Sequence, residues 1–251
     1  MINSKMIFRI LGFLLLIETA MLLCCGAVSL FYKENDLQSF LISSAVTACI
    51  GFLLLAIGKD AVKSLNRRDG YVIVSAAWVT FSLFGMLPYY IGGYIPSITD
   101  AFFETMSGFT TTGATILDDI ESLSHGMLFW RSLTQWIGGL GIVFFTIAIL
   151  PIFTTGGVQL FSAESTGVTH DRTHPKINVM AKWLWTIYLV LTVSETVLLM
   201  FGGMSLFDAI CQSFATTATG GYSTKQNSIS YWNSPYIEYV VAVSYTHLTL
   251  P

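Results

Sequence analysis

The feature that most constrains the fold is residues 97–115, a short apolar segment that ends in a run of Thr and Gly, SITDAFFETMSGFTTTGAT. It is too short to cross a hydrocarbon core of about 30 Å, yet it lies between two segments that are long enough. Ser97 and Asp100 have the spacing of a helix start, and Gly113 readily adopts a positive φ. A chain that stops halfway through a membrane leaves carbonyls unpaired, which is tolerated only inside protein or along a watery path. We therefore expect a re-entrant pore loop whose carbonyls face a passing cation.

A second copy of this pattern occupies residues 205–223, SLFDAICQSFATTATGGYS. The copies align at a constant offset of 108 residues, the difference between Ser97 and Ser205, with four further pairs: Asp100 with Asp208, Ala101 with Ala209, Thr111 with Thr219, and Gly113 with Gly221. A one-residue gap pairs Gly113 with Gly220 instead, so either glycine of the second copy is a candidate equivalent. Internal duplication is frequent in transporters. The alternative is two polar extracellular loops with a chance similarity.

The composition is typical of a membrane protein. Hydrophobic residues make up 53% of the chain and charged residues 11%, against about 25% charged in soluble domains. The mean hydropathy is +0.66. A net charge of −3 without a basic block argues against nucleic acid as a partner. The cysteines lie within apolar segments, without metal or disulfide spacing, and we expect all of them to be small core residues: Cys24, Cys25, Cys49 and Cys211.

Long apolar segments predict an all-α membrane protein. The expected spans are 6–32, 40–58, 71–93, 127–153 and 179–203, and a sixth begins at Tyr236. Short pore helices are expected at 100–108 and 208–215. The fold class is therefore a set of helix–re-entrant pore loop–helix repeats, related by an axis along the membrane normal and preceded by an extra N-terminal helix pair. The expected units are a two-helix extension with its loop (1–69), the first repeat (70–153), a cytoplasmic linker (154–178), an incomplete second repeat (179–242) and a tail (243–251).

The positive charges orient the chain. With the N-terminus in the cytoplasm, nine of the twelve Lys and Arg residues are cytoplasmic: Lys5, Arg9, Lys59, Lys63, Arg67, Arg68, Arg172, Lys176 and Lys182. Lys33 and Lys225 then lie outside, and Arg131 lies near the outer end of the fourth span. Both pore loops open to the exterior, which is the geometry of an importer.

The final residues, 243–251, read VSYTHLTLP and break the apolar pattern where a sixth span would deepen. They match the translated read-through of a common sequencing-library adapter. We expect them to be an artefact and the natural gene to continue. The alternative is a polar C-terminal tail.

Specific runs resemble a known transporter superfamily. AFFETMSGFTTTGATIL, with FWRSLTQWIGGLGIVFFTIAILP at 129–151, resembles the Trk/Ktr/HKT superfamily of potassium transporters, nearest to its TrkH branch. FATTATGGYST at 214–224 resembles that superfamily's second pore loop, and the linker GGVQLFSAEST at 156–166 fits as well. The resemblance extends to about residue 240. The superfamily has four such loops and this chain has two, so the resemblance implies part of a translocating subunit. The extra helix pair favours the TrkH branch over KtrB.

The resemblance implies potassium uptake through a selectivity filter made of backbone carbonyls, with one critical Gly in each repeat, here Gly113 and Gly221. The filter residues it assigns are Thr110, Thr111, Thr112, Gly113, Thr217, Ala218, Thr219, Gly220 and Gly221. The carbonyls that it assigns to potassium are those of Thr111, Thr112, Thr219 and Gly220. No organic cofactor is expected.

The expected location is the bacterial cytoplasmic (inner) membrane, surrounded by lipid. The resemblance also implies a homodimer when full length and a cytoplasmic nucleotide-binding regulatory subunit, similar to TrkA, which docks on linkers 59–69 and 153–178. Movement of the ion is either passive conduction or ion-coupled transport.

The sequence leaves the roles of several residues around the filter undecided. Three acidic residues follow the first filter without a nearby Lys and form either an acidic mouth that concentrates cations or a merely solvated loop: Asp118, Asp119 and Glu121. Glu104 is interpreted as a hydrogen-bond anchor for the filter backbone. Arg131 either binds loop carbonyls or the acidic mouth, or is a snorkelling anchor.

For the remaining polar residues and glycines, the sequence favours structural roles. Glu18 and Glu195 lie within spans and are predicted to be protonated or hydrogen-bonded contacts between helices. The glycines of GGLG at 138–141 are predicted to allow close helix packing. His170 and His174 have a metal-compatible spacing but lie in a charged linker. No set of nucleophile, His and acid indicates an enzyme. The rival functions are a transporter for sodium or another solute and, less favoured, an intramembrane enzyme that uses Glu18, Glu195 or the His pair.

Overall fold

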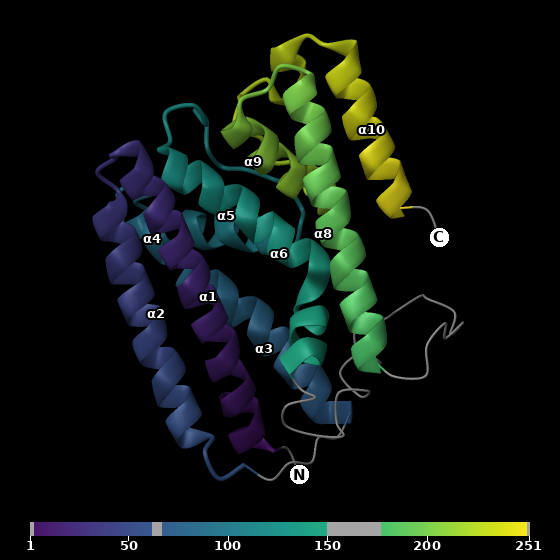
Figure 1. Cartoon of the computed structure of the whole chain (residues 1–251). Coiled ribbons are helices and arrows are strands. Elements are labelled where there is room, and N and C mark those ends of the chain that lie inside the picture. The colour runs from purple at the N-terminus through teal and green to yellow at the C-terminus, as the bar shows by residue number, and fades with distance from the viewer. Residues whose placement is uncertain (1–2, 62–66, 150–176, 250–251) are drawn as a thin grey trace.

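The computed structural model describes residues 3–61, 67–149 and 177–249, and within these ranges the secondary structure is entirely helical. The predicted linker 154–178, with His170 and His174, lies almost wholly outside the described residues. So does part of the predicted basic loop, at 62–66. Long helices run up and down the molecule, and the shorter α5 (Ile98–Phe109) and α9 (Leu206–Thr217) lie towards the end opposite the N-terminus (Figure 1).

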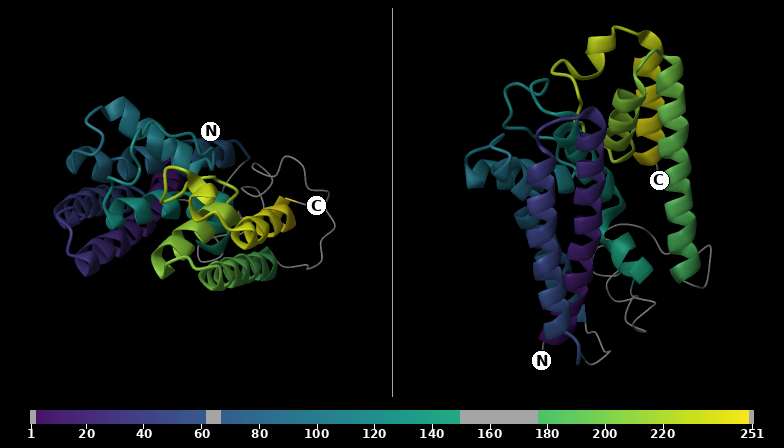
Figure 2. Two further views of the ribbon diagram at one scale, coloured as in Figure 1. Left: turned by 90° about the horizontal axis from the view of Figure 1, so that it is seen from above. Right: turned by 60° about the vertical axis from the view of Figure 1, so that its left-hand side comes forward.

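The N-terminal pair consists of α1 (Ser4–Tyr32) and α2 (Leu37–Ile57), which lie antiparallel, side by side (Figures 1 and 2). The Asn3 side chain caps the start of α1 by accepting a hydrogen bond from the Met6 N–H at 3.3 Å. The pair packs closely because glycine faces glycine: a Cβ on Gly12 would lie 2.8 Å from the Gly51 carbonyl oxygen. Small residues at such crossings allow van der Waals contact between helix backbones in a membrane.

The region predicted as the first repeat contains α3 (Arg67–Gly85), α4 (Leu87–Ile91), α5 (Ile98–Phe109) and α6 (His125–Ile149). The sequence predicted one uninterrupted span over 71–93, but the structure divides it between α3 and α4 at Met86. Pro88 explains the interruption, because it has no N–H to continue the helical ladder. Within α6, Gly141 has φ 67° and ψ 146°, which breaks the regular helix near its end.

The second repeat contains α8 (Ile177–Phe201) and α9 (Leu206–Thr217), followed by the 3₁₀ turn η2 (Ser228–Trp232) and α10 (Pro235–Thr249). α8 rises alongside α9, and α10 descends beside α8 (Figure 1). The helix continues through most of the predicted tail, as far as Thr249.

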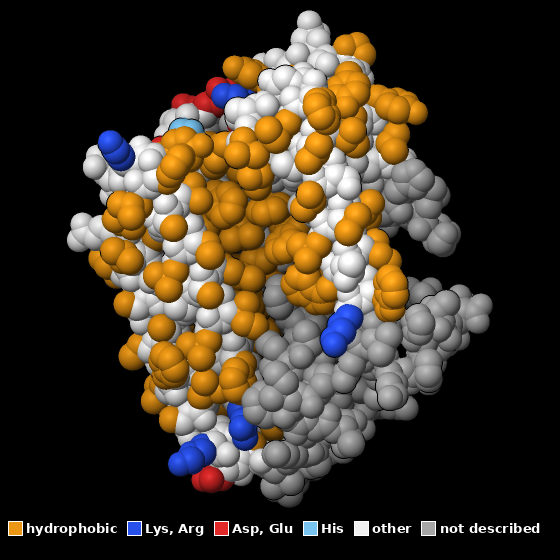
Figure 3. All heavy atoms as spheres, viewed as in Figure 1, with side chains coloured by type: hydrophobic (Ala, Val, Ile, Leu, Met, Phe, Trp, Pro, Cys, Tyr) orange, Lys and Arg blue, Asp and Glu red, His pale blue; other side chains and the backbone are white. Residues whose placement is uncertain are grey.

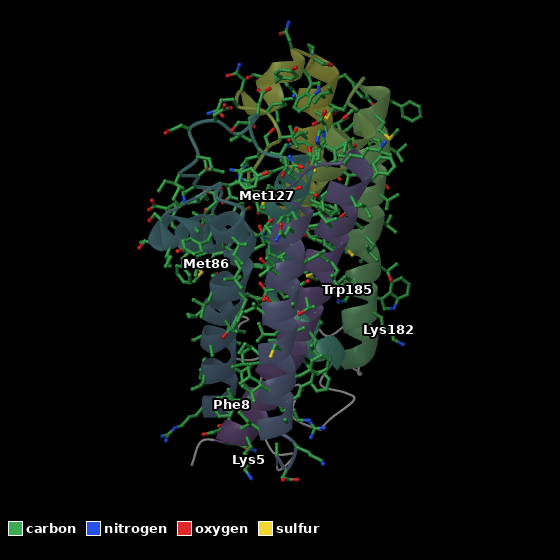
Figure 4. All side chains as sticks on the ribbon, turned by 90° about the vertical axis from the view of Figure 1, so that its left-hand side faces the viewer. Lys5, Phe8, Met86, Met127, Lys182 and Trp185 are labelled. Atoms are coloured by element: carbon green, nitrogen blue, oxygen red, sulfur yellow. The ribbon has the colours of Figure 1, made fainter. Side chains whose placement is uncertain are left out.

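Among the described residues, four segments are long and apolar enough to cross a membrane: Ser4–Tyr32, Leu37–Ile57, Arg68–Ile91 and Lys182–Phe201. Hydrophobic side chains cover much of the face formed by α1, α2 and α8, and most charged side chains on that face lie towards its two ends (Figure 3). Lys5 lies at the N-terminal end, and Lys182 points outward from the lower part of α8 (Figure 4). This surface is the pattern expected of helices that face lipid.

Helix α6 is at the centre of the packing, in contact with α1, α5, α8 and α9. Its buried Trp130 donates a hydrogen bond from Nε1 to the Gly85 carbonyl at 2.9 Å, which ties α6 to the end of α3. The prediction that all four cysteines are core residues is half right. Cys25 and Cys211 are buried, whereas Cys24 and Cys49 are exposed, because each lies on an outward helix face.

Candidate functional site

The two short helices α5 and α9 begin in the same way. The Ser97 hydroxyl accepts from the Asp100 N–H at 3.4 Å, and the Ser205 hydroxyl accepts from the Asp208 N–H at 3.1 Å. Each serine has an extended backbone and satisfies an amide that would otherwise have no partner in the first helical turn. The predicted helix starts are confirmed in both copies.

The loops that follow the two helices share one backbone pattern at the 108-residue offset. The Thr111 N–H donates to the Gly108 carbonyl, as Thr219 N–H does to Thr216. The amide one residue later turns back to the helix in both copies. The positive φ angles match as well: 53° and 54° at Thr111 and Thr219, and 74° and 85° at Gly113 and Gly221. A left-handed threonine is strained, so its occurrence at two equivalent positions marks a specific loop conformation.

These angles decide which glycine of the second copy matches Gly113. Gly221 has a positive φ and Gly220 does not, so the alignment without a gap is the right one. Glycine is required at these positions because a Cβ in the left-handed region is strained by about 1–2 kcal/mol.

The helices extend further towards the loops than predicted. α5 ends at Phe109 rather than 108, with Thr110 as its cap, and α9 ends at Thr217 rather than 215, with Ala218 as its cap. Thr217, predicted as a filter residue, is therefore the last helical residue of α9, because Ala218 N–H still bonds back to the Phe214 carbonyl. Its hydroxyl points towards Glu195 Oε2 at 3.4 Å.

Carbonyls in both loops are open to a ligand. Among the described residues, none donates a hydrogen bond to the carbonyl oxygens of Thr111, Thr112 or Thr219. The Gly220 carbonyl differs, because it accepts from Gln135 Nε2 at 2.8 Å. Of the four carbonyls predicted to bind an ion, Gly220 is thus the one whose oxygen already has a partner.

Glu104, in the middle of α5, holds the chain that leaves the first loop. Its Oε2 accepts from the Ile116 N–H at 3.0 Å, and its two oxygens accept from the Thr115 hydroxyl at 3.0 Å. Arg131 Nε donates to Glu104 Oε1 at 2.8 Å, and the two side chains are 2% and 0% exposed. The interpretation of Glu104 as a backbone anchor is confirmed.

Arg131 also reaches the second loop. Its Nη1 donates to the Ser223 carbonyl at 3.2 Å, and its guanidinium carbon lies 3.9 Å from the centre of the Tyr222 ring. Tyr222 completes the connection, since its hydroxyl donates to the Glu104 carbonyl at 2.9 Å. Of the roles left open by the sequence, binding of loop carbonyls is the correct one, and Arg131 is not a snorkelling anchor.

Sequence reasoning missed Gln135, which lies one helical turn after Arg131. It is fully buried and contacts the second loop through both ends of its amide. A signal was present: polar residues at i and i+4 in an apolar span share one helix face, which indicates a polar partner there.

The glycines of α6 allow the loops to approach. A Cβ on Gly138 would lie 1.9 Å from the Phe109 carbonyl oxygen, and one on Gly139 would lie 2.7 Å from the Ala218 Cα. The predicted close-packing role is confirmed for these two. Gly141 instead provides the break in α6.

Known proteins share the sequence and the fold of this chain over most of its length. Residues 36–245 match the TrkH family, described as cation transport proteins. The chain belongs to the TrkH family. It is 42% identical over 244 residues to the Trk system potassium uptake protein TrkH of Escherichia coli strain K12, covering 96% of this chain and 50% of that relative. It is 36% identical over 249 residues to the potassium uptake protein TrkG of the same strain, covering 98% of this chain and 51% of that one.

The fold agrees with a solved member of the TrkH family. The crystal structure of the potassium transporter TrkH from Vibrio parahaemolyticus matches with a TM-score of 0.80 and 36% sequence identity, covering 96% of this chain and 48% of that one. The chain therefore spans about half the length of the relatives it matches. Its family and its long apolar helices are those of a multi-pass membrane protein.

Two further acidic residues of this TrkH-family chain are buried within spans. Glu18 on α1 is fully buried, and neither carboxylate oxygen has a hydrogen-bond partner among the described residues. Its Oε1 would lie 2.9 Å from a Cβ on Gly85, at the end of α3. Glu195 has one such unpartnered oxygen, and its other oxygen faces Thr217. Both lie between helices as predicted. Of the two predicted alternatives, the hydrogen-bonded one is found for Glu195 and, among the described residues, not for Glu18.

The acidic mouth has a cation that the sequence did not suggest. Lys225, from the second loop, lies 3.5 Å from Glu121 Oε2, and the Gln226 side chain accepts from the Ile120 N–H at 3.0 Å. The prediction of a mouth without a nearby Lys is wrong, because the fold brings together residues about a hundred positions apart. Asp118 and Asp119 remain exposed beside this pair.

Proposed function

We propose that the full-length protein takes up potassium through a filter of backbone carbonyls and that this chain supplies two of the four loops around the ion. The observation that supports this most directly is the repeated loop conformation, with left-handed backbone at Thr111 and Thr219 and at Gly113 and Gly221. A backbone bent in the same way twice presents equivalent rows of carbonyls, and neutral oxygens in a fixed ring replace the water of a dehydrating cation.

The proposed filter consists of Thr110, Thr111, Thr112 and Gly113 in the first loop and of Ala218, Thr219, Gly220 and Gly221 in the second, with Thr217 at the helix end below. The open carbonyls of Thr111, Thr112 and Thr219 are the proposed potassium ligands. α5 and α9 both end immediately before these residues. Their C-terminal ends carry partial negative charge, which favours a cation in the pore.

The setting follows the relatives' names, which describe potassium uptake by a Trk system. We place the protein in the bacterial inner membrane with its N-terminus in the cytoplasm. We also propose that the full-length subunit forms a homodimer and binds a TrkA-like nucleotide-binding subunit on linkers 59–69 and 153–178. Exposed apolar faces on α8, including Val190, Val193 and Phe201, suit lipid or further helices of the same subunit.

The test is growth and ion uptake by a bacterium that lacks its own potassium uptake systems. We expect the completed gene to restore growth at limiting potassium and to accumulate rubidium, with potassium competing far better than sodium. Equal competition by sodium would contradict potassium selectivity and favour the rival sodium transporter.

Residues 1–251 expressed alone provide a second arm. Because a ring of carbonyls needs loops on every side of the ion, we expect no restored growth from this half. Robust growth on the half alone would overturn the four-loop arrangement.

A further inference from the structure

The side-chain amide of Gln135 hydrogen-bonds to the second loop through both its nitrogen and its oxygen. Its Nε2 donates to the Gly220 carbonyl at 2.8 Å, and its Oε1 accepts from the Tyr222 N–H at 3.1 Å. The side chain is fully buried, so neither bond competes with water. An amide that bonds to a carbonyl and to an N–H two residues later fixes the peptide groups on both sides of Gly221.

Gly220 has no side chain, and this leaves space for the Gln135 amide. A Cβ on Gly220 would lie 2.4 Å from Gln135 Cδ, so any side chain there would overlap the amide plane. Its φ is not positive, so backbone conformation does not require glycine. The equivalent residue of the first loop is Thr112, which carries a side chain and has no such amide against it. Contact with Gln135 therefore accounts for the glycine at this position.

The same carbonyl touches the first loop. A Cβ on Gly113 would lie 2.0 Å from the Gly220 oxygen, which places that oxygen directly against the Gly113 backbone. The two filter strands thus meet at Gly113 and Gly220. Whatever fixes the direction of the Gly220 carbonyl also fixes the spacing between the strands.

We propose that Gln135 is a positioning residue for ion selectivity: it turns the Gly220 carbonyl into a structural contact between the two filter strands, so that this oxygen is not an ion ligand. This rests on the proposed function. Gln135 belongs to α6 of the first repeat and bonds to the loop of the second. The two repeats therefore form one filter unit rather than two independent loops. The spacing that distinguishes potassium from smaller sodium depends on this amide.

The first experiment changes the amide in the full-length protein. Gln135→Leu keeps much of the size and removes both hydrogen bonds, whereas Gln135→Glu keeps the acceptor for Tyr222 and removes the donor for Gly220. We expect the potassium-to-sodium uptake ratio to fall roughly tenfold for both variants, which is the effect of about 1.4 kcal/mol from lost hydrogen bonds. Uptake of sodium itself should rise or persist.

Ser132→Ala is the matched control, because Ser132 is buried on the same helix and its hydroxyl bonds to the Leu128 carbonyl within α6. It should leave the ratio unchanged. A Gln135→Leu protein that is folded and retains the wild-type ratio would overturn the proposal. Absence of potassium uptake by the wild-type protein would instead overturn the proposed function, so the two failures are distinguishable.

The second experiment tests the steric contact and does not depend on transport. Gly220→Ala alone should lower the melting temperature and the yield of monodisperse full-length protein, because its Cβ meets the Gln135 amide. In the Gln135→Ala background the same substitution should have little further effect, because the obstructing amide is gone. The double variant should recover folding without recovering selectivity. Equal damage by Gly220→Ala in both backgrounds would show that another contact requires this glycine, and would overturn the proposal.

Discussion

The two proposed pore loops have the same backbone conformation and are held by different contacts. Both begin at a serine-capped helix and bend through a left-handed threonine and glycine. The first is held by a charged pair, Glu104 with Arg131, in which the carboxylate lies inside the loop's own helix. The position equivalent to Glu104 in the second copy is Gln212, whose Oε1 has no hydrogen-bond partner among the described residues. The second loop is held from outside, by Arg131 and Gln135 of the first repeat.

The two copies therefore share the loop conformation that we propose to face the ion, but they differ in how it is held. A carboxylate and a guanidinium buried together form strong, directional hydrogen bonds, but each depends on the other for compensation of its charge. A neutral amide makes weaker bonds without that dependence. The first repeat is therefore the scaffold on which the second loop is placed.

The largest expected effect is loss of the charge that both loops share. Arg131→Met should leave Glu104 buried without its counter-ion and lower the free energy of unfolding by about 3–5 kcal/mol. The measurement is thermal unfolding of the full-length protein in detergent, with exposed Lys33→Met as the control. The double change with Glu104→Gln should be less damaging than Arg131→Met alone, because no unpaired charge remains. If the double variant is less stable than Arg131→Met, the unpaired charge of Glu104 is not the cause of the lost stability.

The next effect distinguishes the two proposed filter glycines. Gly113→Ala and Gly221→Ala should each lower the free energy of unfolding by about 1–2 kcal/mol, because a Cβ in the left-handed region is strained. The loss should be larger for Gly113→Ala, because its Cβ also meets the Gly220 oxygen, whereas nothing lies within 4 Å of a Cβ on Gly221. Melting temperature and the potassium-to-sodium uptake ratio should both rank Gly113→Ala as the more severe change.

Thr115→Ser is the control for the glycine pair, because it keeps the hydroxyl that donates to Glu104. If Thr115→Ser lowers the potassium-to-sodium uptake ratio as much as Gly113→Ala does, the filter assignment is refuted.

A smaller effect concerns the bond between the loops. Tyr222→Phe removes the hydroxyl that donates to the Glu104 carbonyl at 2.9 Å but keeps the ring against Arg131. We expect a loss of about 1 kcal/mol in the free energy of unfolding, with the ion pair intact. A loss as large as that of Arg131→Met would mean that the two loops depend on the tyrosine rather than on the arginine.

The smallest effect compares the helix caps. Ser97→Ala and Ser205→Ala should each lower the free energy of unfolding by about 1 kcal/mol. Ser205 should lose slightly more, because its hydroxyl is closer to the amide it caps and also donates to the Asp208 carboxylate at 2.7 Å. Ser97→Asp should restore most of the loss, since aspartate also accepts at a helix start, whereas Ser205→Asp should not, because its carboxylate would face the Asp208 carboxylate. No change on removing either serine would show that the caps do not set the helix starts.

The sequence by itself determined four long apolar segments, the two short helices, their caps and the equivalence of the Thr and Gly runs. These depend on apolar length and on contacts between residues a few positions apart, so the pattern is readable in one stretch. Local predictions from the sequence were wrong where such rules compete. Pro88 interrupts a predicted span, and α9 continues to Thr217, beyond its apolar residues.

Only the tertiary structure decided how the loops are held. Gln135 and Gly220, Arg131 and Ser223, and Glu121 and Lys225 are pairs that lie far apart in the chain. Each member is an ordinary polar residue in its own segment, and a hydrogen bond between them depends on how helices and loops pack around α6. That packing is the sum of many weak contacts over the whole molecule, and local patterns do not record which distant residue each polar group will meet.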